Sequence, residues 1–192
     1  MTPALEAAYA EPHRRYHSRA HIESCLALLG EQGGLSTTDR QILEYAIWWH
    51  DAVYDPTRSD NEDASAVMAR RDLLAMGMDP VIAGEVARLI LLTKGHVVSP
   101  GDRLAALMVS IDLAILGAEP AAYDAYAADV RQEYAHVPDP LFQAGRVKVM
   151  RRFLDADAIF PDLAFRARLE SPARANITRE LQGLAASVTT TG

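Results

Sequence analysis

The residues of this chain that are best suited to bind a metal ion fall in three separate segments. His17 and His21 lie four residues apart, His50 and Asp51 are adjacent, and Asp112 lies in a long apolar stretch. Imidazole and carboxylate groups together suit a divalent cation of the manganese-to-zinc series or magnesium. Because helical bundles build metal sites from side chains on facing helices, this set predicts a site assembled from three helices.

Asp112 is the most informative of these residues because its surroundings are apolar. On a helix its neighbours on the same face are Met108, Val109, Ile115 and Leu116. A buried carboxylate without a partner is costly, so we expect Asp112 to face a cation or a metal, or to have a raised pKa. The residue alone leaves an alternative open, which is an ion pair with a buried arginine or a hydrogen bond with a loop amide.

The two pairs that contain histidine are weaker signals when each is taken alone. His50 and Asp51 follow an apolar stretch at the expected end of a helix, where both side chains can converge on one ion. A pair on the protein surface is the alternative. The spacing of His17 and His21 places both imidazoles on one helical face. We expect His21 to face inward and His17, near the start of that helix, to stay partly exposed.

The elements that must position these side chains are predicted to be helices. Alanine and leucine are abundant, and no run of alternating β-branched residues indicates a strand. We predict an all-α fold, a compact single-domain bundle of about seven to eight helices over residues 1–186, followed by a disordered tail at 187–192. The helices are expected at about residues 17–31, 36–51, from 59 onward, 80–93, between 100 and 117, and at 119–135, 140–154 and 172–186.

Three of these helices have start signals in the sequence. Ser36 is expected to cap the second helix, and Asp79 followed by Pro80 is typical of an N-cap and a first helical position. Ser59 and Glu62 have the spacing of a capping box, which is the structural interpretation of Glu62. The functional alternative for Glu62 is a carboxylate near the metal that positions a water molecule.

The charge balance limits the classes of partner. The chain has 192 residues with 19 Lys and Arg and 26 Asp and Glu, a formal net charge of -7. Neither a nucleic-acid polymer nor an anionic membrane is an expected partner, because no basic field would attract it. The single cysteine, Cys25, cannot form a disulfide within the chain or a cysteine-based metal site. With no leader-like segment and no apolar run of about 20 residues, we expect a cytoplasmic protein. The oligomeric state is left open, a homodimer included.

The order His21, His50-Asp51 and Asp112 resembles the signature of the HD-domain superfamily of metal-dependent phosphohydrolases. The sequence around these residues is similar to a small bacterial branch of predicted phosphohydrolases within that superfamily. The similar segments are Glu11-Pro-His-Arg-Arg-Tyr-His-Ser-Arg-Ala-His-Ile, Trp49-His-Asp-Ala-Val-Tyr-Asp-Pro, Ser59-Asp-Asn-Glu, Asp112-Leu-Ala-Ile-Leu-Gly and Phe142-Gln-Ala-Gly-Arg. The resemblance covers roughly residues 9 to 160.

This resemblance implies a ligand set and a reaction. It makes His21, His50, Asp51 and Asp112 the ligands of one divalent metal, which could be Mn, Co, Ni, Fe, Zn or Mg. It implies hydrolysis of a small phosphorylated molecule, such as a nucleotide, by water that the metal activates, with Asp51 also able to accept the proton of that water.

His96 is the only histidine between Asp51 and Asp112, whereas relatives with two or more metals usually have two in this interval. One metal is therefore the prediction. His96 itself is a candidate for an extra ligand or a proton donor, against the alternative of a solvated loop histidine.

Binding of a phosphate requires positive groups near the site. Arg14, Lys94, Arg131 and Arg146 lie close in sequence to the predicted site helices, and we expect one or two of them to point inward. Arg14, Lys94 and Arg146 are the predicted substrate-binding residues.

Two other functions are compatible with the same residues. One is a di-iron oxygenase of the same fold, which needs more ligands than this chain supplies. The other is a regulatory module in which the metal is structural and no reaction takes place. Phosphate release and oxygen uptake would distinguish these alternatives from a phosphohydrolase.

Overall fold

The computed structural model describes residues 2–189, and the side chains of these up to residue 186. The described residues form nine α-helices and one 3-10 helix and contain no strand, which confirms the all-α prediction. The chain divides into two compact units, Met1–Asp112 and Leu113–Gly192, which are described separately below. The single domain predicted over residues 1–186 thus contains two such units.

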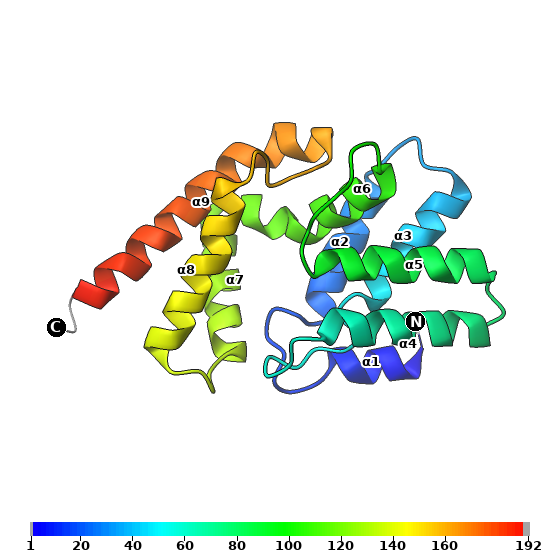
Figure 1. Cartoon of the computed structure of the whole chain (residues 1–192), viewed down its shortest axis with the longest axis horizontal. Coiled ribbons are helices and arrows are strands. Elements are labelled where there is room, and N and C mark those ends of the chain that lie inside the picture. The colour runs from blue at the N-terminus through cyan, green and yellow to red at the C-terminus, as the bar shows by residue number, and fades with distance from the viewer. Residues whose placement is uncertain (1, 190–192) are drawn as a thin grey trace. The chain divides into compact units, whose positions relative to one another are not determined.

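The first unit contains six helices. They are α1 (Pro3–Tyr9), α2 (Arg19–Gly30), α3 (Thr37–Trp49), α4 (Asn61–Ala75), α5 (Pro80–Thr93) and α6 (Arg103–Asp112). Helices α4 and α5 lie side by side as an antiparallel pair (Figure 1), and α3 packs against α2, α4, α5 and α6. The core between them is built from apolar side chains that are fully buried, among them Leu43, Ile47, Leu89, Ile90 and Met108.

Local signals placed some helix starts correctly. The Ser36 side chain accepts a hydrogen bond from the Asp39 amide at the start of α3, and the Asp79 side chain accepts one from the Val81 amide at the start of α5. Both caps were predicted. Helix α1 was not, although Thr2 caps it and Pro3 follows at the first helical position.

Two predictions about helix starts in the first unit are wrong. The N-cap of α4 is Asp60, not Ser59, and no side chain caps that helix, so the predicted capping box with Glu62 does not form. Helix α2 begins at Arg19, two residues after His17, so His17 and His21 do not share one helix. In both places, the predicted start is one or two positions upstream of the one in the structure.

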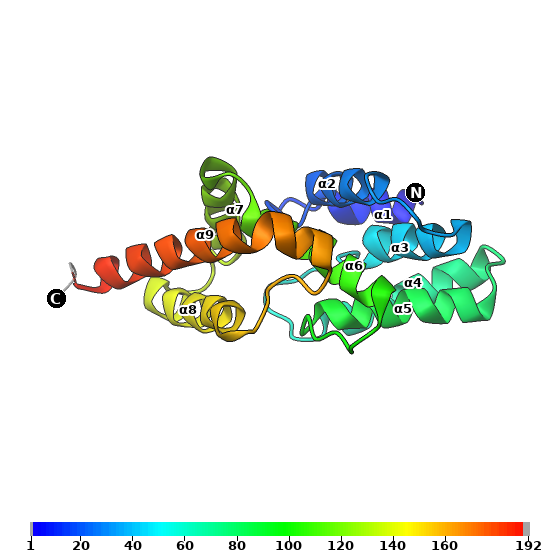
Figure 2. The same ribbon diagram turned by 90° about the horizontal axis from the view of Figure 1, so that it is seen from above.

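The second unit begins directly after Asp112. It contains the 3-10 helix η1 (Leu113–Gly117) followed by α7 (Pro120–Glu133), α8 (Asp139–Asp155) and α9 (Leu163–Thr189). Helix α9 packs against α8 and η1, and Figure 2 shows α7 and α8 on either side of α9. A Cβ atom on Gly117 would lie 2.6 Å from the Leu169 Cβ atom, so glycine permits the close approach of η1 to α9.

Helix α9 differs most from its prediction. It begins nine residues before Pro172, which therefore lies inside the helix. The Asp162 carboxylate accepts hydrogen bonds from the amides of Ala164 and Phe165 and caps this earlier start. The helix continues to Thr189, so residues 187–189 of the predicted tail have a helical backbone, and residues 190–192 lie outside the described part of the chain.

No single helix in the described part of the chain is long and apolar enough to cross a membrane. One pair of consecutive helical segments, Arg103–Gly117 and Pro120–Glu133, meets the length and composition criteria, but only when the two are taken together across their break.

Candidate metal centre

Three helix ends of the first unit carry the candidate ligands. His21 lies in the first turn of α2, His50 is the residue that caps the end of α3, and Asp51 follows it. Asp112 is the last residue of α6. Because backbone direction changes at a helix end, the adjacent residues His50 and Asp51 can direct their side chains to the same point.

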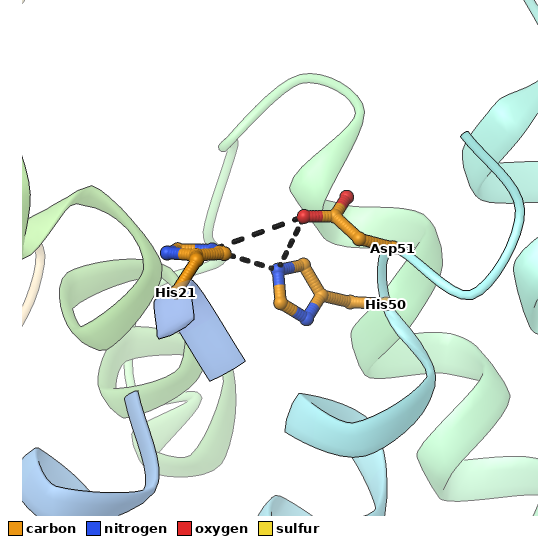
Figure 3. Close-up of side chains that lie close together, drawn as sticks. All are labelled: His21, His50 and Asp51. Carbon is orange, nitrogen blue, oxygen red and sulfur yellow. Dashed lines mark hydrogen bonds and ion pairs between the residues drawn. The ribbon is translucent and has the colours of Figure 1, made fainter. Parts of the chain in front are cut away.

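His21, His50 and Asp51 converge closely (Figure 3). The two imidazole Nε2 atoms are 3.2 Å apart. The Asp51 Oδ2 atom lies 3.1 Å from the Nε2 atom of His50 and 3.8 Å from that of His21. These three donor atoms could hold a metal ion.

Asp112 lies next to this group, although it is not one of the three residues whose ligand atoms all lie close to one another. Its Oδ1 atom is 3.3 Å from the His21 Nε2 atom and 3.4 Å from the His50 Nε2 atom. The structure therefore brings together all four residues that the sequence analysis identified as ligands. They come from segments that are far apart in the chain.

The spacing of the donor atoms fits a small divalent cation. An ion bound at about 2.1 Å from each ligand holds neighbouring ligand atoms about 3.0 to 3.4 Å apart in octahedral or tetrahedral geometry. Four of the five separations given above lie between 3.1 and 3.4 Å. A mixture of nitrogen and oxygen donors suits the divalent metals from manganese to zinc. Magnesium is also compatible, although it binds imidazole less readily than these metals do.

His50 is oriented by its own helix. Its Nδ1 atom lies 2.8 Å from the carbonyl oxygen of Ile47, so Nδ1 donates and Nε2 faces the cluster. Burial by itself disfavours the protonated imidazole, but the carboxylates of Asp51 and Asp112 outweigh it and raise the pKa of His50 well above its ordinary value. Without a metal, the cluster thus retains a proton that an ion would displace.

The two carboxylates are ionised. Burial would raise the pKa of each, yet His50 beside Asp51 holds the pKa of that carboxyl far below its usual range. Hydrogen bonds with His21, His50 and His96 lower the pKa of Asp112 in the same way. The side chains of Asp51 and Asp112 are 17% and 15% exposed, against 4% and 2% for His21 and His50, so the cluster opens to solvent on its carboxylate side.

Cys25 lies against the cluster without being a suitable ligand. Its Sγ atom is 3.8 Å from both ring nitrogens of His21. Burial, and then the nearby carboxylates of Asp112 and Asp51, raise the pKa of this thiol well above its ordinary value. Cys25 is therefore a thiol in the metal-free protein, and it is not one of the three residues whose ligand atoms could together hold an ion.

His96 takes part in the cluster through Asp112. Its Nε2 atom lies 3.2 Å from the Oδ2 atom of Asp112, the oxygen that does not face the other two histidines. The backbone of His96 has a φ of 55°, the only positive φ of a non-glycine residue in the described part of the chain. Such strain occurs where the surrounding structure requires one orientation of a side chain. The alternative of a solvated loop histidine is therefore wrong.

His17 lies outside the ligand set. It precedes α2, and its ring stacks on Tyr54 with 4.2 Å between ring centroids. This agrees with its expected partial exposure.

Glu62 and Lys94 occupy the neighbouring α4 and α5 ends and contribute no donor atom to the described cluster. Lys94 forms an exposed ion pair with Asp63, its Nζ atom 2.5 Å from a carboxylate oxygen. An exposed pair of this kind can exchange partners, so the structure does not decide the substrate-binding prediction for Lys94.

Arg14 is close to the cluster but is not available to a substrate. Its side chain is fully buried, and its guanidinium donates to the Glu11 carboxylate and to the carbonyl oxygens of His17, Asp51 and Ala52. These partners occupy the groups that a phosphate would need, so the predicted substrate-binding role of Arg14 is replaced by a role within the protein. One signal could have predicted this pairing, which is the position of Glu11 three residues before Arg14.

Arg146 and Arg131 belong to the second unit, and their guanidinium groups also donate to partners within the protein. Arg146 is buried and pairs with Glu180 at 2.7 Å, and it donates to the Tyr126 hydroxyl as well. Arg131 donates to the carbonyl oxygens of Tyr134 and Val137. Arg146 thus links α8 to α7 and α9, and its predicted role in substrate binding is replaced by this structural one.

No family model, curated protein or solved structure matches this chain, so the site is interpreted from its own geometry.

Proposed function

We propose that this protein is a metal-dependent phosphohydrolase that acts on a small phosphorylated molecule. The observation that supports the proposal is the convergence of His21, His50, Asp51 and Asp112, with donor separations that fit one divalent cation. Their order along the chain is also the order in which the HD-domain superfamily has its ligands. The proposal includes one metal, because His21, His50 and Asp51 converge on one point and Asp112 lies beside them.

The charge of the site supports a requirement for the metal. Two ionised carboxylates lie on the side of the cluster that is open to solvent. Without a cation this opening repels a phosphate group, and a divalent ion reverses the sign of the local field. When bound, such an ion lowers the pKa of a coordinated water and neutralises charge on the phosphoryl oxygens.

The side chains of the cluster have separate roles in this proposal. His21 and His50 are buried and act as ligands only. Asp51 is ionised and partly exposed, so it can also accept the proton of the attacking water. His96 holds the second oxygen of Asp112 at the same opening and is the candidate proton donor for the leaving group.

Phosphate release tests the proposal directly. The full-length protein is freed of metal with a chelator, loaded separately with Mn, Co, Ni, Fe, Zn or Mg, and incubated with nucleotides and small phosphoesters. We expect turnover with at least one metal, and loss of both turnover and bound metal in Asp112→Ala. Asp60→Ala is the matched control, because Asp60 is an exposed acid of the same unit outside the cluster.

Three results would contradict the proposal. Full metal occupancy and full hydrolysis in Asp112→Ala would show that the ligand set is wrong. Tight metal binding without hydrolysis of any phosphoester would favour a regulatory metal module. Uptake of oxygen by an iron-loaded protein would favour oxidation.

A further inference from the structure

Arg14 connects two of the segments that carry metal ligands. Its Nη1 atom donates to the carbonyl oxygen of Asp51 at 2.7 Å and to that of His17 at 3.0 Å. Its Nη2 atom donates to the carbonyl oxygen of Ala52 at 3.2 Å. The first and third carbonyls lie just after α3, at the ligand Asp51, and the second lies just before α2, whose first turn carries His21.

The guanidinium is itself held from several sides. Its Nε atom donates to the Glu11 carboxylate at 2.9 Å. The rings of Tyr9 and Tyr54 also lie against the guanidinium. The distance from the guanidinium carbon to the ring centroid is 5.2 Å for Tyr9 and 5.4 Å for Tyr54. The Tyr9 hydroxyl in turn donates to the carbonyl oxygen of Trp48 at the end of α3. The orientation of the Arg14 side chain is thus determined by the protein and not by solvent.

The contacted carbonyls are groups that need a partner. Backbone carbonyls that are shielded from water need a hydrogen-bond partner, and those of Asp51 and Ala52 lie in the segment after α3, where no helix supplies one. Arg14 satisfies those of Asp51 and Ala52 and thereby restricts the backbone from which the Asp51 carboxylate projects. The same side chain restricts the backbone that precedes His21.

From these contacts we propose that Arg14 is a positioning residue of the metal site, which sets the direction of Asp51 and its distance from His21. This inference rests on the metal centre of the proposed function. It adds a residue that contacts neither the metal nor the substrate. Only arginine suits the role, because one planar guanidinium spans three carbonyls and a carboxylate, whereas a lysine ammonium presents its donors from a single atom.

The test uses Co(II), whose visible spectrum reports the geometry and number of its ligands. Arg14→Met retains the length of the side chain and removes its donors, and Arg14→Lys retains the charge. We expect both to bind Co(II) about 10- to 100-fold more weakly than the unmodified protein, with altered absorption of the bound ion. Arg14→Lys is expected to be the milder of the two.

Arg40→Met is the matched control. Arg40 also donates to two backbone carbonyls of the same unit, those of Leu29 and Gln32, but these lie at the C-terminal end of α2, whereas His21 is in its first turn. We expect this variant to lose stability and to retain the Co(II) affinity and spectrum. If the Arg14 variants also lost only stability, Arg14 would be a structural residue and the inference would be overturned.

Two further measurements keep the test decisive. If Arg14→Met does not fold, Glu11→Ala removes one anchor of the guanidinium at a half-exposed position, and the same spectral change is expected in weaker form. An unchanged spectrum in this variant and in Arg14→Lys would overturn the inference. If the unmodified protein binds Co(II) but hydrolyses no phosphoester, the proposed function is contradicted. The Co(II) spectra of the Arg14 variants then still test whether Arg14 positions the metal ligands. If the unmodified protein binds no Co(II), both the proposed function and the inference about Arg14 are contradicted.

Discussion

The Nδ1 atom of His50 lies 2.8 Å from the carbonyl oxygen of Ile47, three residues earlier in the same chain segment. A carbonyl oxygen only accepts hydrogen bonds, so Nδ1 carries the proton in the neutral imidazole. The lone pair is then on Nε2, the atom that faces His21, Asp51 and Asp112. The ligand is thus in its metal-binding tautomer by virtue of a contact within its own helix.

The stability of the metal-free protein is expected to fall as the pH rises above neutrality. The pKa of His50 is raised in the folded state, where Asp51 and Asp112 outweigh the effect of burial. Protonation of His50 therefore stabilises the fold fully below the ordinary histidine pKa of about 6.5, and this contribution is lost as the pH passes through the raised value. Thermal unfolding in a chelator should show a lower Tm at pH 9 than at pH 7.

A saturating divalent metal should remove most of this dependence, because the ion replaces the proton between the same groups. His50→Gln is the control, since it has no imidazole to titrate at this position. The Tm of this variant and the Tm of the unmodified protein are both measured in a chelator across the same pH range. If the two change equally with pH, His50 is not the group responsible.

Replacement of Asp112 by asparagine should weaken metal binding by about 100-fold or more, beyond the range typical of a partner outside the ligand set. The asparagine is nearly isosteric but brings no negative charge to the two imidazoles. A titration with Co(II) followed by absorbance measures the affinity. Asp63→Asn, at an exposed ion pair, should bind the metal as the unmodified protein does. Similar affinities for both variants would place the metal elsewhere.

Gly117→Ala should destabilise the protein by about 1–3 kcal/mol through overpacking. The added methyl would lie 2.6 Å from the Leu169 Cβ atom and 2.8 Å from its carbonyl oxygen, neither of which can move without shifting α9. The free energy of unfolding in urea measures the loss.

Gly145→Ala is the matched control for that substitution. Gly145 lies inside α8, and a Cβ atom there meets nothing within 4 Å. Alanine should therefore stabilise the helix by about 0.5–1 kcal/mol. No loss of stability in Gly117→Ala would contradict the packing of η1 against α9, and a loss in Gly145→Ala would contradict the open surroundings of Gly145.

Arg146→Met should destabilise the protein by about 3–5 kcal/mol, because it leaves the Glu180 carboxylate buried without its cation. The two side chains are 8% and 13% exposed, and Glu180 also accepts a hydrogen bond from Tyr123. Arg179→Met removes an ion pair with Asp124 whose side chains are 43% and 64% exposed, and it should cost less than about 1 kcal/mol. Equal losses in the two variants would mean that burial of the Arg146 pair has no energetic consequence.

Several features could be predicted from the chain because they depend on residues within one turn of each other. The caps at Ser36 and Asp79 satisfy amides two or three positions away. The position of Asp112 among apolar neighbours indicated a carboxylate that needs a cation. Where two adjacent residues could serve equally well, as Ser59 and Asp60 do before α4, composition alone chose wrongly. Pro172 was taken as a helix start, whereas α9 begins at Leu163 and is capped by Asp162.

The sequence by itself determined the helical class, most of the helix positions and the two types of donor, imidazole and carboxylate, that could hold a metal. Only the tertiary structure decided that the ends of α2, α3 and α6 meet, that Asp112 shares its second oxygen with His96, and that Arg14 is bound to backbone carbonyls rather than available to a phosphate. The physical reason is the distance along the chain over which each interaction acts. Capping and periodicity act between neighbours in the chain, whereas the partners of a buried charge are chosen by the packing of segments that are distant in sequence.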